Sequence, residues 1–204
     1  MIRRSERKAV VVLRIEPLTP DHWDALANLF GKAGASSGCW CMYWRLGPAY
    51  YRRPHALNRE DLRDLVSAGP PPGLLAFDGE LAVGWCQLTP RDALPWLDHA
   101  RYLGRVDEAP VWSISCFFVR RGYRRQGVAS ALILAAVDAA RAAHADVLEA
   151  YPVDASVPGA TRNNFTGSAA AFRRAGFATV TARTPSRPIM RYDLRAGPAV
   201  GAAD

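Results

Sequence analysis

The stretch that decides the fold is CFFVRRGYRRQGVA, residues 116–129. It begins as a strand of aromatic and β-branched residues, passes through a turn with four arginines, and ends on small residues that open a helix. The first turn of a helix carries N–H groups without internal partners, and these groups bind anions together with the helix dipole. Gly127 and Ala129 leave the backbone open to phosphate, and arginine offers paired planar donors to phosphate oxygens. The stretch therefore predicts a phosphate-binding turn between a strand and a helix.

The rest of the chain predicts an α/β domain of the α+β type around that turn. Helices are expected over residues 19–30, 58–68, 126–143 and 167–175, and strands over 10–15, 73–77, 81–88, 111–119, 147–153, 177–183 and 188–194. Asp78-Gly79 predicts a hairpin, because both residues tolerate the positive φ angles of a two-residue turn. Residues 34–51 look like an ordered loop, and 89–110 form a connection long enough to be a binding lid. Antiparallel neighbours followed by one crossover predict a mixed sheet with helices packed on it.

The length of 204 residues predicts a single domain. We expect that domain to cover residues 10–194. Residues 1–9 are polar and basic, and residues 195–204 lack both periodicity and bulky side chains, so both ends are predicted to be flexible.

The charge of the chain is concentrated in two places. The formal net charge is +7, from 26 basic and 19 acidic residues. Residues 1–8 hold four cations and one anion, which gives +3, and the arginines of the turn at 120–125 give +4, so 3 + 4 accounts for all seven. A neutral domain with one basic turn favours a compact phosphate-bearing ligand over a polyanion such as nucleic acid.

Neither a membrane segment nor a metal site is indicated. The longest early apolar run, residues 9–13, is too short for a signal or a bilayer span, so we expect a cytoplasmic protein without a membrane partner. The four cysteines are then expected as reduced thiols. Cys39 and Cys41 form one close pair, but no histidine stands at a zinc-like spacing from them, so we predict no metal.

The segment Arg124-Arg125-Gln126-Gly127-Val128-Ala129 resembles the R/Q-x-x-G-x-G/A signature of the GCN5-related N-acetyltransferase (GNAT) superfamily. The order of the expected elements is similar to that fold over nearly the whole chain. The resemblance implies a mixed, mostly antiparallel sheet of about seven strands, flanked by helices on both faces. It also implies acetyl-CoA as co-substrate.

The same resemblance implies which residues hold acetyl-CoA. The strand residues Phe117, Phe118 and Val119 would line the pantetheine arm. The turn would present its amides to the pyrophosphate through Arg124, Arg125, Gln126, Gly127, Val128, Ala129 and Ser130.

A second family-like piece, residues 171–177, resembles the Y-x-x-x-G-F helix end beside the cofactor. The resemblance counts Phe172 among the residues that bind the cofactor, at the position where many members have a tyrosine that protonates the leaving thiolate. Tyr151, Ser168 or water would then supply that proton.

Direct attack by a neutral amine on the thioester requires a group that removes a proton. The candidate bases are Glu149, Asp154, Asp107 and Glu108. Strand alternation puts Glu149 and Tyr151 on one face, which suits proton handling beside the cofactor strand. The alternative is that Glu149 and Tyr151 form an edge pair that faces solvent, or that the pair is bound by a salt bridge to a nearby arginine.

Residues 38–45, GCWCMYWR, lie where this fold usually shapes its acceptor pocket. Trp40, Met42 and Trp44 would form an aromatic wall for an apolar or cationic acceptor. Alternatively, Trp40 and Met42 are plugs of the core. Similar loops occur in bacterial members of the superfamily. Trp96, His99 and Tyr102 of the long connection are candidates to close over the same pocket.

The leading hypothesis is an acetyl-CoA-dependent N-acetyltransferase that acts on a primary amine of a small molecule or a protein. One alternative is a CoA-binding sensor with reduced catalysis, suggested by Phe172. The other is a nucleic-acid-binding module, which is weaker because no groove-reading helix or base-stacking motif is recognisable. A homodimer is left open.

Overall fold

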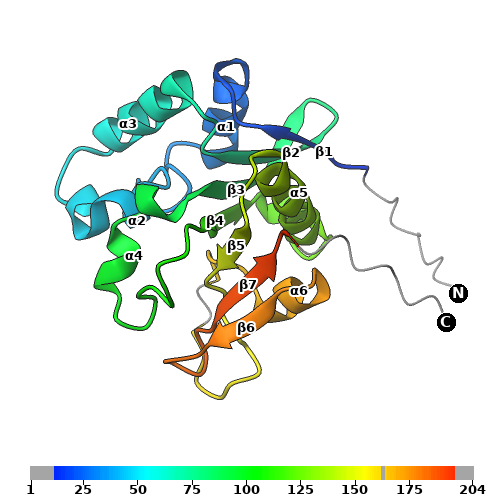
Figure 1. Ribbon diagram of the computed structural model, residues 1–204. Coiled ribbons are helices and arrows are strands. Elements are labelled where there is room, and N and C mark those ends of the chain that lie inside the picture. The colour runs from blue at the N-terminus through cyan, green and yellow to red at the C-terminus, as the bar shows by residue number, and fades with distance from the viewer. Residues whose placement is uncertain (1–11, 162–163, 196–204) are drawn as a thin grey trace, which may run out of the picture.

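A computed structural model describes residues 12–161 and 164–195 of the chain (Figure 1). Its described part forms one seven-stranded sheet in the order β1-β2-β3-β4-β5-β7-β6. The strands are β1 (Arg14–Pro17), β2 (Gly73–Asp78), β3 (Leu81–Pro90), β4 (Trp112–Val119), β5 (Val147–Ala150), β6 (Ala178–Thr181) and β7 (Ile189–Asp193). Neighbours pair antiparallel except β4 and β5, which are parallel. The predicted mixed, mostly antiparallel sheet is confirmed.

Six α-helices and four 3₁₀ turns connect the strands in the described residues. The helices are α1 (Trp23–Phe30), α2 (Tyr43–Leu46), α3 (His55–Ala68), α4 (Trp96–His99), α5 (Val128–Ala142) and α6 (Ala169–Arg174). The 3₁₀ turns are η1 (Pro20–His22), η2 (Gly47–Tyr51), η3 (Arg91–Ala93) and η4 (Arg121–Tyr123). None of these helices is both long and apolar enough to cross a membrane.

Helices cover both faces of the sheet, as predicted (Figure 1). On one face, Leu132 of α5 packs with Leu74 of β2. On the other face, the adjacent residue Leu75 packs with Leu26 of α1 and Leu62 of α3. This alternation is the period of two that a strand buried on both sides requires. The sheet is therefore a central layer with a hydrophobic core on each side.

Gly84 of β3 determines how closely α5 approaches the sheet. A Cβ at this position would lie 2.5 Å from Cγ1 of Val128 and 3.1 Å from Cδ1 of Leu132. Val128 is the first residue of α5. The glycine thus lets the N-terminal end of α5 lie directly against the strand, and it positions the backbone amides of that end.

Three predicted boundaries are wrong for identifiable reasons. β1 begins at Arg14 rather than residue 10, because its pairing with β2 begins at Arg14 and Phe77, one residue before β2 ends in the hairpin turn; residues 10 and 11 lie outside the described part. β5 ends at Ala150 rather than residue 153, because it diverges from β4 there. α5 begins two residues later than expected, since Gly127 is left-handed at φ 85°.

Three further segments contain more helix than the sequence predicts, and one of them is the long connection 89–110, which includes η3 and α4. Residues 34–51, expected as a loop, include α2 and η2, and α3 begins at His55 instead of residue 58. The terminal hairpin of β6 and β7 is confirmed. The predicted flexible ends, residues 1–9 and 195–204, lie outside the described residues except for Arg195.

Candidate active site

β4 and β5 pair over only three residues and then separate, which opens a cleft beside β4. The last paired residues are Ile114 and Ala150, whereas β4 continues to Val119. The freed part of β4 faces the segment before α6, where the Phe117 N–H donates to the Phe165 carbonyl at 2.6 Å. A cleft of about 690 Å³ lies here. Its walls are contributed by β4, the basic turn, the start of α5 and α6.

The basic turn leaves the start of α5 uncovered. No side chain of the described residues caps this helix. The space that a Cβ of Gly127 would occupy is open, with nothing within 4 Å. Two side chains stabilise the turn from outside: Arg124 Nε donates to the Val119 carbonyl at 3.1 Å, and Gln126 Nε2 donates to the Gly122 carbonyl at 2.5 Å. Free amides, a helix dipole and nearby guanidinium groups make this an anion-binding end.

The structure brings most of the predicted cofactor residues together along this cleft. Those that line it are Phe117, Phe118, Val119, Arg124, Arg125, Gly127, Val128, Ala129 and Ser130. Gln126 does not line it, because its amide bonds within the turn. Arg174, at the end of α6, also lines the cleft, although the sequence did not predict it as a cofactor residue. The two adjacent arginines at the end of this helix were the feature that could have indicated it.

Phe172 lies behind the cleft rather than in it. Its side chain is fully buried, with its ring 6.1 Å from that of Phe117 and 4.9 Å from that of Phe177. The prediction that Phe172 contacts the cofactor directly is therefore revised. The residue supports Phe117, which does line the cleft.

A second cavity, also of about 690 Å³, adjoins the first, and Phe117 and Phe165 line both. Its walls are aromatic: Tyr43, Trp44, Tyr50, Tyr51 and Tyr102 all line it. Of the three residues predicted for the acceptor pocket, Trp44 is in place. Its indole N–H donates to the Ser115 carbonyl at 3.0 Å, which fixes the ring beside β4.

Trp40 and Met42 are plugs of the core, as the alternative interpretation had it. Both are buried in the cluster under α1 and α3, and neither lines the cavity. Trp40 stacks on Trp23 with a ring separation of 6.0 Å. In the long connection, Tyr102 reaches the cavity, whereas Trp96 stacks on His99 at 4.1 Å and neither of those two lines it.

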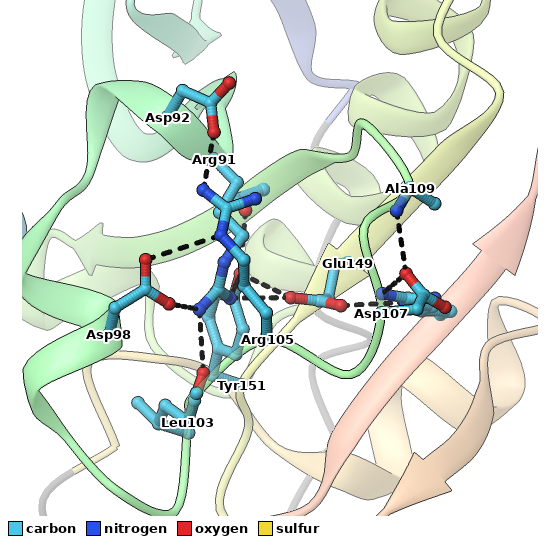
Figure 2. A network of polar contacts seen from close by, with 12 residues as sticks. Arg91, Asp92, Asp98, Leu103, Arg105, Asp107, Ala109, Glu149 and Tyr151 are labelled. Atoms are coloured by element: carbon cyan, nitrogen blue, oxygen red, sulfur yellow. Dashed lines mark hydrogen bonds and ion pairs between the residues drawn. The ribbon is translucent and has the colours of Figure 1, made fainter.

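Glu149 and Tyr151 face one another, as strand alternation predicts, but within a buried ionic network (Figure 2). The Tyr151 hydroxyl donates to Glu149 Oε1 at 2.8 Å. Arg91 Nη1 donates to the same carboxylate oxygen at 2.8 Å, and Arg191 Nε donates to the other oxygen at 2.8 Å. Burial, and then the Glu149 charge, raise the pKa of Tyr151 far above its usual range, so the phenol stays a neutral donor.

This network ties the long connection to the sheet. Arg91 of η3 also bonds Asp98 of α4 at 2.5 Å and the Leu103 carbonyl at 2.8 Å (Figure 2). Neither Glu149 nor Tyr151 lines the cleft or the aromatic cavity. The geometry therefore gives Glu149 the salt-bridge role that the sequence left as its alternative.

The sequence also matches a family model described as the acetyltransferase (GNAT) family, over residues 39–177. That span is more than half of the chain, and it contains the cleft, the basic turn and both cavity-lining phenylalanines. The chain belongs to the GNAT acetyltransferase family. It is accordingly an N-acetyltransferase, and members of this family use acetyl-CoA as donor. No protein with a curated description matches the sequence.

Solved GNAT structures share the fold at low sequence identity. The PaiA N-acetyltransferase of Thermoplasma acidophilum, solved with coenzyme A, is 14% identical with a TM-score of 0.51, covering 89% of this chain and 99% of that one. The GNAT domain of S. lividans PAT is 17% identical with a TM-score of 0.54, covering 89% and 90%. A Drosophila melanogaster polyamine N-acetyltransferase that forms N-acetylagmatine is 10% identical with a TM-score of 0.52, covering 88% and 98%.

The remaining candidate bases lie away from both cavities of this GNAT domain. Asp154 accepts from the Ser156 hydroxyl and pairs with Arg173, and these contacts lower its pKa to about 2. Asp107 pairs with Arg191 at 2.6 Å. Glu108 is exposed. Among the described residues, no Asp, Glu or His side chain lines either cavity.

The aromatic cavity of the GNAT domain does contain thiols. Cys39, Cys41 and Cys116 line it, and the Cys41 and Cys116 sulfurs lie 3.8 Å apart. A hydrogen bond from Cys41 lowers the pKa of Cys39 to about 6, against the opposing effect of burial. Cys39 is thus a thiolate near neutral pH. Within the described residues, no group of three His, Cys, Asp or Glu side chains is placed to hold a metal ion.

Proposed function

We propose that this GNAT enzyme transfers an acetyl group from acetyl-CoA, bound in the cleft, to a primary amine of a small molecule or protein that enters the aromatic cavity. The observation that carries the proposal is that two cavities of equal size meet at Phe117 and Phe165. One has the chemistry of a phosphate site, and the other is lined by aromatic side chains together with serine and threonine hydroxyls. A donor and an acceptor held in this way would meet at the shared residues.

The residues of the cleft fit acetyl-CoA in both charge and shape. The open amides at the start of α5, with Arg124, Arg125 and Arg174 nearby, suit the phosphates. The freed part of β4 from Phe117 to Val119 suits the pantetheine arm. Bound acetyl-CoA supplies an acetyl thioester, whose carbonyl carbon a neutral amine can attack directly while the thiol leaves. Because the arginines line a confined cleft, this arrangement favours a compact phosphate-bearing ligand over nucleic acid.

The residues that line the two cavities limit which groups can remove a proton from the amine and protonate the leaving thiolate. Since no carboxylate or imidazole of the described residues does so, we propose that water in the open cavity takes the proton of the amine. Ser168, which lines the cleft, remains the candidate to pass a proton from water to the leaving thiolate, because Tyr151 is enclosed in its ionic network. The serine regains from water the proton that it gives to the thiolate, so it ends the step as a hydroxyl. The free thiols at all four cysteines agree with the cytoplasmic location that the sequence predicts.

Substitution of Gly127 tests the donor site. Gly127→Val puts a branched side chain into the open space at the start of α5 and should lower acetyl-CoA affinity at least about 100-fold, measured by isothermal titration calorimetry. Gly79→Val is the matched control, because Gly79 also has a positive φ, 57° against 85° at Gly127, and open surroundings, but lies in the β2-β3 turn. Unchanged affinity in Gly127→Val would refute the cleft as the acetyl-CoA site.

Release of free thiol from acetyl-CoA then tests catalysis. The wild-type enzyme should release CoA thiol in the presence of at least one amine class. Tight acetyl-CoA binding without thiol release over a broad amine panel would instead favour the sensor hypothesis.

A further inference from the structure

One charged side chain in the aromatic cavity has no ion-pair partner among the described residues. Arg187 lines the cavity from the segment between β6 and β7, two residues before β7 begins. Its Nε is buried and has no hydrogen-bond partner among the described residues. A buried guanidinium donor without an acceptor is costly, and such groups are normally satisfied by a carboxylate or another oxygen.

The position of Arg187 is fixed by its surroundings. Its backbone N–H donates to the Thr184 carbonyl at 2.8 Å, and the adjacent Ser186 carbonyl accepts from the Asp154 N–H at 2.9 Å. The guanidinium carbon lies 5.9 Å from the centre of the Tyr102 ring. Burial lowers the pKa of Arg187, but an arginine side chain keeps its charge at any physiological pH. The cavity therefore holds a positioned cation.

Thr166 supplies a second unsatisfied polar atom in the same cavity. Its side chain is buried, it lines the cavity, and its Oγ1 has no hydrogen-bond partner among the described residues. A hydroxyl can donate to a carboxylate oxygen, as a guanidinium does. Arg187 and Thr166 thus each bring a buried polar atom without a hydrogen-bond partner among the described residues to one cavity, which is consistent with a ligand that satisfies both.

The cavity disfavours an acceptor with several positive charges, because its described lining offers one thiol with a lowered pKa, Cys39, but no carboxylate. Among the described lining residues there is no Asp or Glu that could pair with an additional ammonium group. Aromatic rings can bind cations, but the ring of Tyr102 already faces the guanidinium of Arg187. A polyamine or an aminoglycoside would bring several positive charges beside that arginine, with no carboxylate to offset the repulsion.

We infer that the acceptor is an amine that also carries a carboxylate, an amino-acid-like molecule whose carboxylate pairs with Arg187 and bonds Thr166 while its apolar part packs on the tyrosines and Trp44. This inference rests on the proposed function and narrows its acceptor class. The planar fork of arginine matches the two oxygens of a carboxylate, which would orient the amine relative to the shared residue Phe117.

Acceptors that differ only in the carboxylate test the inference. The panel pairs the common L-amino acids with their amides and their decarboxylated amines, and adds spermidine and kanamycin as polycations. Thiol release from acetyl-CoA gives kcat/KM for each. We expect kcat/KM to be on the order of 100-fold higher for carboxylate-bearing amines than for their matched amides and decarboxylated amines. An acceptor without a carboxylate would leave the buried guanidinium of Arg187 unpaired.

Variants link that preference to Arg187. Arg187→Gln should abolish the preference and Arg187→Lys should keep part of it, while Arg101→Gln, which removes an exposed arginine beside Tyr102 in sequence, should change nothing. Acetyl-CoA affinity and circular dichroism verify that each variant is folded. The inference is overturned if polycations or decarboxylated amines are the better substrates, or if Arg187→Gln retains the preference.

A binding measurement keeps this test separate from the proposed function. Calorimetry with N-acetylated amino acids and their amides measures the carboxylate site without turnover. If acetyl-CoA binds but no carboxylate-bearing amine reacts and no N-acetylamino acid binds, the acceptor inference fails while the proposed function stands. If acetyl-CoA itself does not bind, the proposed function fails.

Discussion

Replacing Glu149 with glutamine separates a structural role from a chemical one. The substitution keeps the shape of the side chain and removes its charge. In the structure that charge is shared by Arg91 and Arg191, both at 2.8 Å, and it accepts the Tyr151 hydroxyl. The Glu149 side chain is 1% exposed and that of Arg91 is 2% exposed, so water cannot replace the lost partner.

The expected cost follows from this burial. Breaking a buried pair by removing one partner costs about 3–5 kcal/mol of unfolding free energy when the remaining charge is left uncompensated. Here Arg91 keeps Asp98 and Arg191 keeps Asp107, so we expect the lower end of that range, about 3 kcal/mol. For a protein of this size, each kcal/mol lowers the melting temperature by about 2–4 °C, which gives a decrease of roughly 6–12 °C. Asp98→Asn is the comparison, because Asp98 pairs with the same arginine from a side chain that is 40% exposed. Because this carboxylate is partly exposed, Asp98→Asn should lower the unfolding free energy by about 1 kcal/mol or less.

Urea unfolding followed by circular dichroism measures both free energies, and thiol release measures turnover at a temperature where both variants are folded. If Glu149 is structural, the unfolding free energy falls by the amount above while turnover per folded molecule and its pH profile stay within a few-fold of wild type. A Glu149→Gln variant as stable as wild type, with turnover reduced 100-fold or more, would refute this reasoning and restore Glu149 as the general base.

Two further predictions concern the start of α5 and the thiols. Gly84→Ala should cost about 1–3 kcal/mol of stability and also weaken acetyl-CoA binding, because its Cβ would lie 2.5 Å from Val128 and push the start of α5 outward; calorimetry showing wild-type affinity would contradict this. Iodoacetamide should modify Cys39 first, at a rate that rises between pH 5 and 7 and is level above, because the thiolate form increases through a pKa of about 6. Mass spectrometry identifies the modified cysteine. Buried Cys86, whose pKa is raised, serves as the unreactive control. A rate of Cys39 modification that still rises above about pH 8 would rule out the lowered pKa.

The parts of the fold that were predictable depend on neighbours in sequence. The hairpin of β2 and β3 follows from Asp78-Gly79 between two apolar runs. The turn before α5 follows from four arginines and Gly127 between a strand pattern and a helix pattern. Strand alternation likewise predicts that Glu149 and Tyr151 face one another. In each case the signal spans only a few residues, which is the range over which backbone preferences act.

The environment of those side chains was not predictable in the same way. From the sequence, a glutamate at position 149 of a strand could equally well line a cleft or form an ion pair. The ion pair forms because Arg91 and Arg191, 58 and 42 residues away in sequence, reach Glu149 in the fold. Trp40 and Trp44 lie in one aromatic run, yet one is in the core and the other lines the cavity. The two tryptophans differ because α1 and α3 cover one face of this loop and leave the other face toward the cavity.

The strands of the sheet, its longer helices and the phosphate-binding turn could be predicted from the sequence, because hydrophobic periodicity, glycine and charge act locally. Only the tertiary structure decided which groups line the acceptor cavity. Arg187 and Tyr102 are far apart in the chain and carry no motif, and they meet because the β6-β7 turn folds back against the long connection. A binding surface of this kind is produced by packing, so its chemistry becomes visible only when the distant segments are brought together.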